Sequence, residues 1–395
     1  MENLKEETVL KLDKKQLQTV ITDHLLELNG IHELFEMFVN GLMYCERKTF
    51  LTSTEENNKG NGFREVSKFG IGSKLQLRIP RDRLGVFQPM ILGLLEEQEE
   101  QIKDLCFELY GKGLTTREIE DVVEKIYGKQ YSKSSISRIT TDFSKLIESW
   151  LERTLEAYYP IIYIDAIHIK VRRDTVSTEA FYVLLGLRED HTREVLGIVN
   201  IPQESATGWQ EVLENLKQRG VQKVGLFVSD DLTGLSDTIS KVYANSLKQK
   251  CVLHYMRNIS KELRKEDKEK MMQEIKESFQ PDNPKKTAQD GIQMLRKVFE
   301  NWSKIYPKLY KKSQKEEMEH LFTYFHFDYR IRRMIYTTNW IERLNKSFRR
   351  TLKMRKALPS PESAITLLGF VAMEMTESSY SYPISNFRFD SNFAK

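Results

Sequence analysis

The sequence has few cysteines, no long apolar run and little net charge, and each shortage excludes a class of protein. Cysteine occurs three times among 395 residues and never as a CxxC pair. This argues against a disulfide framework or a cysteine-rich zinc module and favours a reducing cytoplasm. The longest apolar stretches, such as residues 181–187 and 364–373, are well short of the roughly 18 residues that a membrane span needs. We therefore expect a soluble protein without a membrane partner.

The net charge of +4 is small for a chain of this length. A nucleic-acid partner must therefore be argued from where basic residues cluster and not from their total. The length allows two or three domains, and the hydrophobic fraction of 40% is enough for a sizeable core.

The first part of the chain has mainly helical spacing. Residues 1 to about 58 carry apolar residues three and four apart, and residues 52–62 are polar and contain glycine, which predicts a loop. Residues 74–79 alternate polar and apolar side chains, which predicts a half-exposed strand that Pro80 stops.

Residues 115–143 fit a helix-turn-helix, the fold of many DNA readers. Thr115 and Glu118 form a capping box, Gly128 lies where the first helix should end, and Ser132 can cap a second helix over residues 133–143. An ordinary helical hairpin with solvated polar residues fits the pattern equally well. In the DNA-reading interpretation the exposed side chains of the second helix contact DNA, among them Lys133, Ser134, Ser137 and Arg138.

A second region begins after Pro160 and predicts a mixed α/β core. Three β-rich runs, residues 161–171, 180–187 and 194–201, precede a helix that Ser205 caps, a strand at 223–229, another helix and a short strand at 251–253. This order is that of a ribonuclease-H-like sheet, although other mixed α/β folds share it. Residues 256–335 lack strand alternation and predict an all-helical insertion.

These patterns divide the chain into five parts. We expect an N-terminal helical region at 1–60, a DNA-binding region at 61–155, the catalytic core at 156–255 and 336–375, the insertion at 256–335, and a C-terminal tail at 376–395.

Two aspartates lie where the predicted strands should bring them together. Asp165 is in phase with the apolar face of its strand, where a carboxylate is costly unless a cation compensates it. Asp230 follows an apolar strand, at the edge of the sheet where ligands of α/β folds usually bind.

The third acid, Glu342, begins a basic helix. Thr338 or Asn339 can cap this helix, and Glu342 lies in its first turn, one residue away from the buried stripe. No other acid follows before residue 356, so we expect the flank of the helix to attract phosphate. The basic residues expected to contact DNA are Arg343, Lys346, Arg349, Arg350 and Lys353.

Phosphodiester chemistry explains why acids are required. Two Mg²⁺ ions roughly 3.5–4 Å apart stabilise charge on the attacking and leaving oxygens, and Mg²⁺ prefers carboxylate ligands. We assign Asp165 to both ions, Asp230 to one and Glu342 to the other, and expect Mn²⁺ to substitute.

Taken together, the motifs of this chain resemble those of the Mutator-like transposases of bacterial insertion sequences. The resemblance covers residues 62–375, most of the chain, and is most specific at TTNWIERLNKSFRR, residues 337–350, in company with YIDAIHIK at 163–170 and VSDDLTGL at 228–235. It also includes YSKSSISRIT at 131–140 and CVLHYMRN at 251–258.

The resemblance implies a DDE transposase, whose site is Asp165, Asp230 and Glu342. It further implies binding to the terminal inverted repeats of the element and to target DNA, a homodimer on DNA, a circular DNA intermediate, and action at the bacterial nucleoid in the cytoplasm. One departure concerns the second acid: the family usually has glycine after it, whereas here Asp231 follows Asp230. A neighbouring carboxylate could share the metal role, but Asp230 matches the motif.

We expect three further residues, His254, Asn345 and Trp340, to support the site. Cys251 and His254 belong to a C-x-x-H motif, but a zinc site needs two further ligands and the sequence has no partner pair. We therefore expect Cys251 to be packed core, and His254 to contact DNA or support the carboxylates. Asn345 is a second candidate for support, and Trp340 either stacks on a base near the cut or is buried packing.

Two other functions stay open. A catalytically inactive, transposase-derived DNA-binding regulator would keep the basic helix but lose an acid, and all three acids are present. A ribonuclease-H-like nuclease would lack a region dedicated to the inverted repeats.

Overall fold

A computed structural model describes residues 30–384 except 54–57, 71–72, 128–132 and 356. The chain has a mixed α/β structure and divides into two compact units, Met1–Thr141 and Asp142–Lys395. Helix α6, Lys133–Leu151, contains the point of division.

The first unit is built around one long helix and a hairpin. Helix α3, Gly30–Ser53, lies on a two-stranded antiparallel sheet of β1, Gly60–Gly70, and β2, Ser73–Asp82, and α4, Met90–Gly111, packs beside them. The buried residues of this small core are Val39, Met43, Leu75, Leu77, Ile79 and Leu95. The helical prediction is confirmed for Gly30–Ser53, and its residues 1–29 lie outside the described part.

The hairpin corrects two sequence predictions. The predicted loop at 52–62 contains the start of β1, a strand that the sequence did not indicate because charged residues and glycines interrupt it. The predicted stop at Pro80 is wrong, since β2 continues to Asp82 and Pro80 pairs with Phe63. In a two-stranded sheet each strand has one unpaired edge, where the missing N–H of proline costs no ladder hydrogen bond.

The predicted helix pair of residues 115–143 is present as helices, and its turn lies outside the described residues. Helix α5, Thr116–Tyr127, begins with the predicted capping box: Glu118 N donates to Thr115 Oγ1 at 3.3 Å, and Thr115 N donates to Glu118 Oε2 at 2.7 Å. Helix α6 continues eight residues beyond the predicted end at 143, to Leu151. Gly128 and Ser132 belong to the part that is not described.

The second unit contains a five-stranded mixed sheet. Its strands are β3, Tyr158–Arg172; β4, Val176–Leu187; β5, Arg193–Asn200; β6, Lys223–Ser229; and β7, Leu247–Lys250. Their order in the sheet is β5-β4-β3-β6-β7. Strand β4 pairs antiparallel with both β3 and β5, whereas β6 pairs parallel with β3 and with β7.

The predicted strands β3 to β6 are confirmed, and the last strand was placed wrongly. The sequence predicted residues 251–253, but β7 is Leu247–Lys250, and Cys251 is the residue before helix α9, Val252–Glu262. The segment LKQK lacks apolar alternation because β7 is an edge strand that pairs only with β6.

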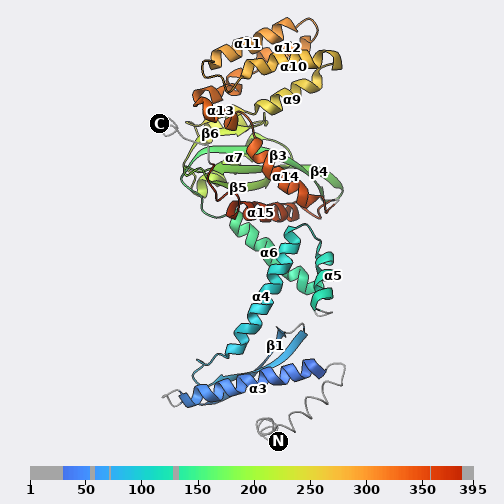
Figure 1. Cartoon of the computed structure of the whole chain (residues 1–395), viewed down its shortest axis with the longest axis vertical. Helices are drawn as coiled ribbons and strands as arrows, with labels where there is room; N and C mark the ends of the chain where they lie inside the picture. The colour runs from blue at the N-terminus through green and yellow to red at the C-terminus, as the bar shows by residue number, and fades with distance from the viewer. Residues whose placement is uncertain (1–29, 54–57, 71–72, 128–132, 356, 385–395) are drawn as a thin grey trace. The chain divides into compact units, whose positions relative to one another are not determined.

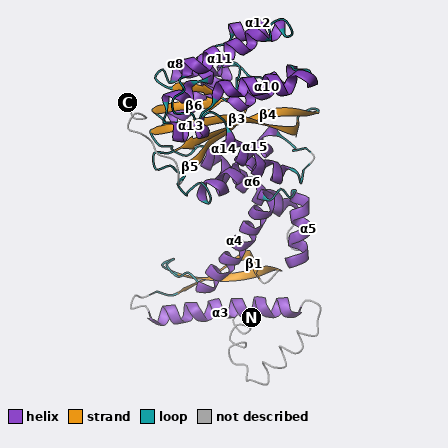
Figure 2. Cartoon of the chain, turned by 45° about the horizontal axis from the view of Figure 1, so that its top comes forward, coloured by secondary structure: helices purple, strands orange, loops and turns teal. Residues whose placement is uncertain are grey.

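Helices cover both faces of this sheet (Figures 1 and 2). Helices α7, Ala206–Gln218, and α8, Leu235–Val242, bury one face, where the fully buried Trp209 meets Tyr182 edge to face at 4.8 Å. Ser205 caps α7 as predicted, accepting a hydrogen bond from Gly208 N. The other face is covered by α14, Asn339–Leu352, and α15, Pro361–Glu377.

Between β7 and α14 the described chain forms helices only, as the sequence predicted. Helices α10 to α12 gather beyond the end of the sheet in Figure 1 and have their own aromatic cluster, in which Phe279 stacks on Phe322 at 5.0 Å. The remaining elements of this segment are α10, Lys265–Phe279; α11, Ala288–Asn301; α12, Pro307–Lys315; η1, Met318–Leu321; η2, Thr323–His326; and α13, Tyr329–Ile335.

Candidate active site

Parallel pairing of β3 with β6 brings the two predicted aspartates together. Ile164 of β3 is in register with Ser229, the last residue of β6, so Asp165 and Asp230 follow neighbouring positions on adjacent strands. The loop after Asp230 turns back through Gly234, which has a φ of 78° and lies so close to Ala206 that a Cβ atom would meet its backbone nitrogen at 2.7 Å. A tight loop therefore holds Asp230 at the end of its strand.

Asp165 is almost completely buried and is held by two hydrogen bonds. Ala166 N donates to its Oδ1 at 2.9 Å, and Asn345 Nδ2 of α14 donates to its Oδ2 at 2.8 Å. Burial first, and then the negative charge of Asp230, raise the pKa of Asp165 to about 6. The carboxylate is therefore costly where it lies, and a cation would remove that cost.

Glu342 lies in the first turn of α14, as predicted, and completes the group. Its charge also raises the pKa of Asp165, because α14 lies against β3 on the face that carries Asp165. Arg257 Nη1 donates to Glu342 Oε1 at 2.9 Å and also lies 3.2 Å from His254 Nε2. Thr338 occupies the N-cap position of this helix, but its side chain makes no capping hydrogen bond.

His254 joins the acids. Its Nδ1 is in contact with Oδ1 of Asp230, and its Nε2 lies 4.0 Å from Oε1 of Glu342. The hydrogen bond with Asp230 is the largest cause that raises the pKa of His254, to about 10. His254 therefore lies next to two of the three acids.

Asp231, the unusual neighbour of Asp230, turns to a different partner. Its Oδ1 lies 2.8 Å from Lys250 Nζ, and its side chain is 71% exposed. Both residues line a small cavity of about 60 Å³, together with Glu316, whose pKa burial raises. A lysine therefore already balances the charge of Asp231.

The donor set fits divalent magnesium or manganese. The three acids from β3, from the end of β6 and from α14 offer hard oxygen ligands, and mutual repulsion with burial already disfavours the charged form of Asp165. Asp165, Asp230 and Glu342 are the residues that would hold such ions. A second possible grouping of ligands adds Cys251 and His254 to Asp230.

Trp340 packs against arginine side chains. The guanidinium of Arg193 lies 4.8 Å from its ring centroid and that of Arg343 lies 5.1 Å away. Arg193 also stacks on Tyr380 at 4.5 Å, so these side chains connect the start of α14 to β5 and to the segment after α15. The ring is half-buried, which places it between the two sequence interpretations.

The basic residues of α14 are exposed. Among the described residues, none of these five side chains forms an ion pair with a carboxylate. They are Arg343, Lys346, Arg349, Arg350 and Lys353. On α6, Ser134, Ser137 and Arg138 are also exposed, and the side chain of Lys133 lies outside the described part.

The sequence patterns assign no role to Arg257, although it lies in the CVLHYMRN motif at 251–258. Arg257 lies three residues after His254 on α9, and residues at this spacing share a helix face. That spacing was a usable signal, but its partner Glu342 is 85 residues away in the chain.

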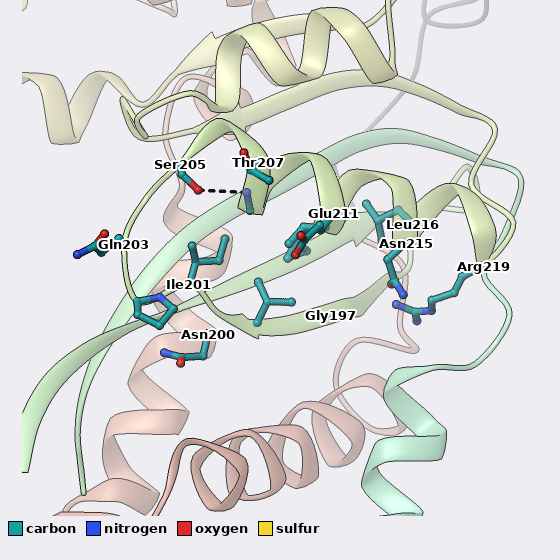
Figure 3. Close-up of a pocket in the computed structure, with 15 residues that line it drawn as sticks. Gly197, Asn200, Ile201, Gln203, Ser205, Thr207, Glu211, Asn215, Leu216 and Arg219 are labelled. Carbon is teal, nitrogen blue, oxygen red and sulfur yellow. Dashed lines mark hydrogen bonds between the residues drawn. The ribbon is translucent and has the colours of Figure 1, made fainter. Parts of the chain in front are cut away.

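A larger cavity lies away from these acids. It has a volume of about 700 Å³ between β5 and α7 and is lined by residues such as Gly197, Val199, Ile201 and Glu211 (Figure 3). None of the three acids lines it. Within the described residues, no helix combines the length and apolarity that a bilayer crossing requires.

The sequence matches the profile of a family described as Transposase, Mutator family, over residues 6–381. It is 32% identical over 345 residues to a transposase for insertion sequence element IS1201 of Lactobacillus helveticus, covering 85% of this chain and 91% of that protein. It is 31% identical over 362 residues to the IS905 transposase of Lactococcus lactis, covering 88% and 90%. Identity to the IS256 transposase of transposon Tn4001 from Staphylococcus aureus is 29% over 336 residues, covering 84% and 85%.

Among solved structures, a chain of the Drosophila P element transposase strand transfer complex matches with a TM-score of 0.29 and 10% identity. The match covers 71% of this chain and 79% of that one.

Proposed function

The chain belongs to the Mutator family of transposases, and from this premise we propose that Asp165, Asp230 and Glu342 are its catalytic acids. The observation that carries the proposal is their convergence: residues from β3, the end of β6 and α14 interact although up to 177 positions, 342 − 165, separate them. The reaction is cleavage of DNA strands at the ends of an insertion sequence, followed by strand transfer.

The fold proposed for the core is ribonuclease-H-like. The supporting observation is the sheet order β5-β4-β3-β6-β7, with three antiparallel strands followed by two parallel ones. The catalytic core is then residues 156–255 and 336–375, interrupted by the helical insertion 256–335. The remaining parts are the N-terminal helical region 1–60, the DNA-binding region 61–155 and the tail 376–395.

The cofactor is Mg²⁺, with Mn²⁺ as a substitute. When bound, the two ions stabilise negative charge on the attacking and leaving oxygens of the phosphodiester. Asp165 would hold both ions, Asp230 one and Glu342 the other. Asn345 orients Asp165 through its 2.8 Å hydrogen bond, and His254 and Arg257 orient Asp230 and Glu342.

The chemistry proceeds in two displacements at phosphorus. A water molecule first attacks the phosphodiester at the element end, and the departing oxygen becomes a free 3′-hydroxyl. That hydroxyl then attacks another phosphodiester, forming one P–O bond while another breaks, so no external energy source is required.

The DNA contacts are proposed on two helices. The exposed basic side chains of α14 follow Glu342 and would bind phosphates beside the acids. Residues 115–143 form a helix-turn-helix that reads the terminal inverted repeats, with Ser134, Ser137 and Arg138 exposed on α6. The protein acts as a homodimer on DNA, at the bacterial nucleoid.

Strand cleavage and joining on DNA from the element ends tests this function. With Mg²⁺ or Mn²⁺ we expect the native protein to cut and join, and Asp165→Ala, Asp230→Ala and Glu342→Ala to do neither. Asp231→Ala is the matched control, because Lys250 already pairs with that acid. Normal cleavage by the first three variants would refute the site.

The same assay separates the alternatives. Cleavage without joining, and without preference for the inverted repeats, would identify a ribonuclease-H-like nuclease. Binding to the repeats without any cleavage would identify an inactive DNA-binding regulator, which the convergence of all three acids argues against.

A further inference from the structure

Cys251 lies beside the contact between His254 and Asp230. One ligand atom from each residue, a carboxylate oxygen, the Sγ atom and a ring nitrogen, lies within 4.8 Å of the others. We propose that Asp230, Cys251 and His254 form a binding site for a thiophilic divalent cation of the Zn²⁺ class. This site differs in chemistry from the carboxylate site and overlaps it through Asp230.

The fold itself brings the three ligands together. Cys251 N donates to Ser229 O at 2.7 Å, which ties the residue after β7 to the residue before Asp230. His254 follows in the first turn of α9, which begins at Val252. Two parallel strands and the start of one helix therefore set the distances between the three ligand residues. Asp230 is not part of the C-x-x-H motif and comes close to it through the pairing of β6 with β7.

The donor types favour zinc over magnesium. A thiolate and an imidazole are ligands that Zn²⁺ prefers, whereas Mg²⁺ prefers oxygen and keeps much of its water. Zinc ligands lie about 2.0 to 2.3 Å from the ion, so small side-chain rotations bring atoms at the observed spacing onto one ion. Three protein ligands leave a fourth position for water, and Cys251 gives up its thiol proton to solvent on binding.

The surroundings allow an ion to enter and support the sulfur. The side chains of Asp230 and His254 are 25% and 23% exposed, whereas Cys251 is buried. Thr338 Oγ1 lies 3.4 Å from Cys251 Sγ, and a hydroxyl at this distance can orient a coordinating sulfur. Two ligands therefore come from partly exposed side chains and the third from the core. Apart from their contact with each other, the buried atoms Asp230 Oδ1 and His254 Nδ1 have no hydrogen-bond partner among the described residues.

An ion held by Cys251 and His254 draws Asp230 away from the catalytic ion. Zinc should therefore inhibit cleavage in competition with magnesium. This consequence rests on the proposed catalytic role of Asp230, whereas the binding of zinc does not.

Cobalt binding to the full-length, metal-free protein tests the site without DNA. We expect one equivalent of Co²⁺ to give a near-ultraviolet thiolate-to-cobalt charge-transfer band that Zn²⁺ abolishes and excess Mg²⁺ does not. The band should be lost in Cys251→Ser and retained in Cys45→Ser, the matched control in α3. Circular dichroism checks folding, and Cys251→Ala replaces Cys251→Ser if the serine variant does not fold. A native protein without the band, or a band that survives loss of Cys251, overturns the proposal.

Zinc inhibition of Mg²⁺-dependent DNA cleavage tests the overlap. Each protein is compared with its own zinc-free rate. We expect half-inhibition of Cys251→Ser to need at least about tenfold more Zn²⁺ than the native protein or Cys45→Ser, equivalent to about 1.4 kcal/mol. Equal inhibition of all three overturns the overlap. If no protein cleaves DNA with Mg²⁺ while the cobalt band is present, the proposed function fails and the metal site stands.

Discussion

The two faces of the five-stranded sheet differ in the side chains that they bring together. On the α7 face lies a cavity of about 700 Å³ whose lining residues are apolar or uncharged except for Glu211 and Arg219. On the α14 face Asp165 is nearly buried, beside two further acids and with Asn345 as its donor. Because strand residues alternate between faces, Val183 opposite Asp165 and its neighbour Leu184 point to these two different environments.

Cavity volume and the chemical reactivity of side chains are therefore separate properties of the two faces. On the α7 face burial lowers the pKa of Arg219 to about 10, whereas on the α14 face burial and neighbouring acids together raise the pKa of Asp165. Perturbed acids near a strand end are a better guide to chemistry than volume. Substitutions on the two faces should therefore have very different effects on DNA cleavage.

The largest effect is expected for Asp165→Asn. The neutral amide keeps the shape of the side chain but cannot hold a divalent cation, so cleavage should fall at least about a thousandfold, or about 4 kcal/mol in the barrier. Strand cleavage at saturating Mg²⁺ measures it. Binding of the same DNA in EDTA should be unchanged, and a cleavage loss below tenfold would mean that Asp165 is not a metal ligand.

A smaller loss is expected for Asn345→Leu. This change removes the donor that orients Asp165, and loss of such a supporting hydrogen bond typically costs about 10- to 100-fold in activity or metal affinity. The Mg²⁺ concentration for half-maximal cleavage should rise accordingly. Asn215→Leu, at the cavity on α7, is the matched control, and equal behaviour of the two variants would contradict the comparison.

Lys346→Ala and Arg349→Ala should weaken DNA binding without affecting the acids. Loss of one phosphate contact reduces affinity by about threefold to tenfold at moderate salt and reduces the salt slope by about one. Binding isotherms across several salt concentrations measure both. Lys241→Ala removes a lysine from α8 on the other face, and its affinity should match that of the native protein. An unchanged slope in the α14 variants would exclude phosphate contact there.

Asp231→Asn should have only a small effect. Its ion pair with Lys250 is largely exposed on the acid side, and such pairs contribute up to about 1 kcal/mol to stability. Cleavage should stay within about threefold of the native rate. A loss comparable to that of Asp165→Asn would give Asp231 the metal role assigned to Asp230.

The smallest effect is expected at the cavity. Gln203 lines it and is exposed, so Gln203→Ala should change the free energy of unfolding by no more than about 0.5 kcal/mol. Thermal unfolding and cleavage assays check both readouts. A large loss of cleavage would show that the α7 face takes part in the reaction.

Much of the second unit could be predicted because its local patterns agree with its tertiary environment. The alternation in β3 and the cap at Ser205 come from strong local preferences, and both are present in the structure. By contrast β7 is a short polar edge strand, and β1 contains charged residues in a two-stranded sheet. Such strands are stabilised by their pairing partners and not by their own residues, so single-sequence patterns cannot find them.

The candidate site, like the fold, could be predicted only in part. The three proposed acids, Asp165, Asp230 and Glu342, follow as candidates from strand phase, strand end and helix turn. The partners of these acids could not be predicted, since Arg257 reaches Glu342 from the helix after β7, and Lys250 takes Asp231.

Local sequence patterns indicate which acids are candidates and that Glu342 lies at the start of a basic helix. The contacts of Asp230 with His254 and of its neighbour Asp231 with Lys250 follow from the fold alone. The reason is that spacing along one chain sets residue type and helix or strand phase. The meeting of β3, β6, α9 and α14 depends instead on long-range pairing and packing, which no local pattern encodes.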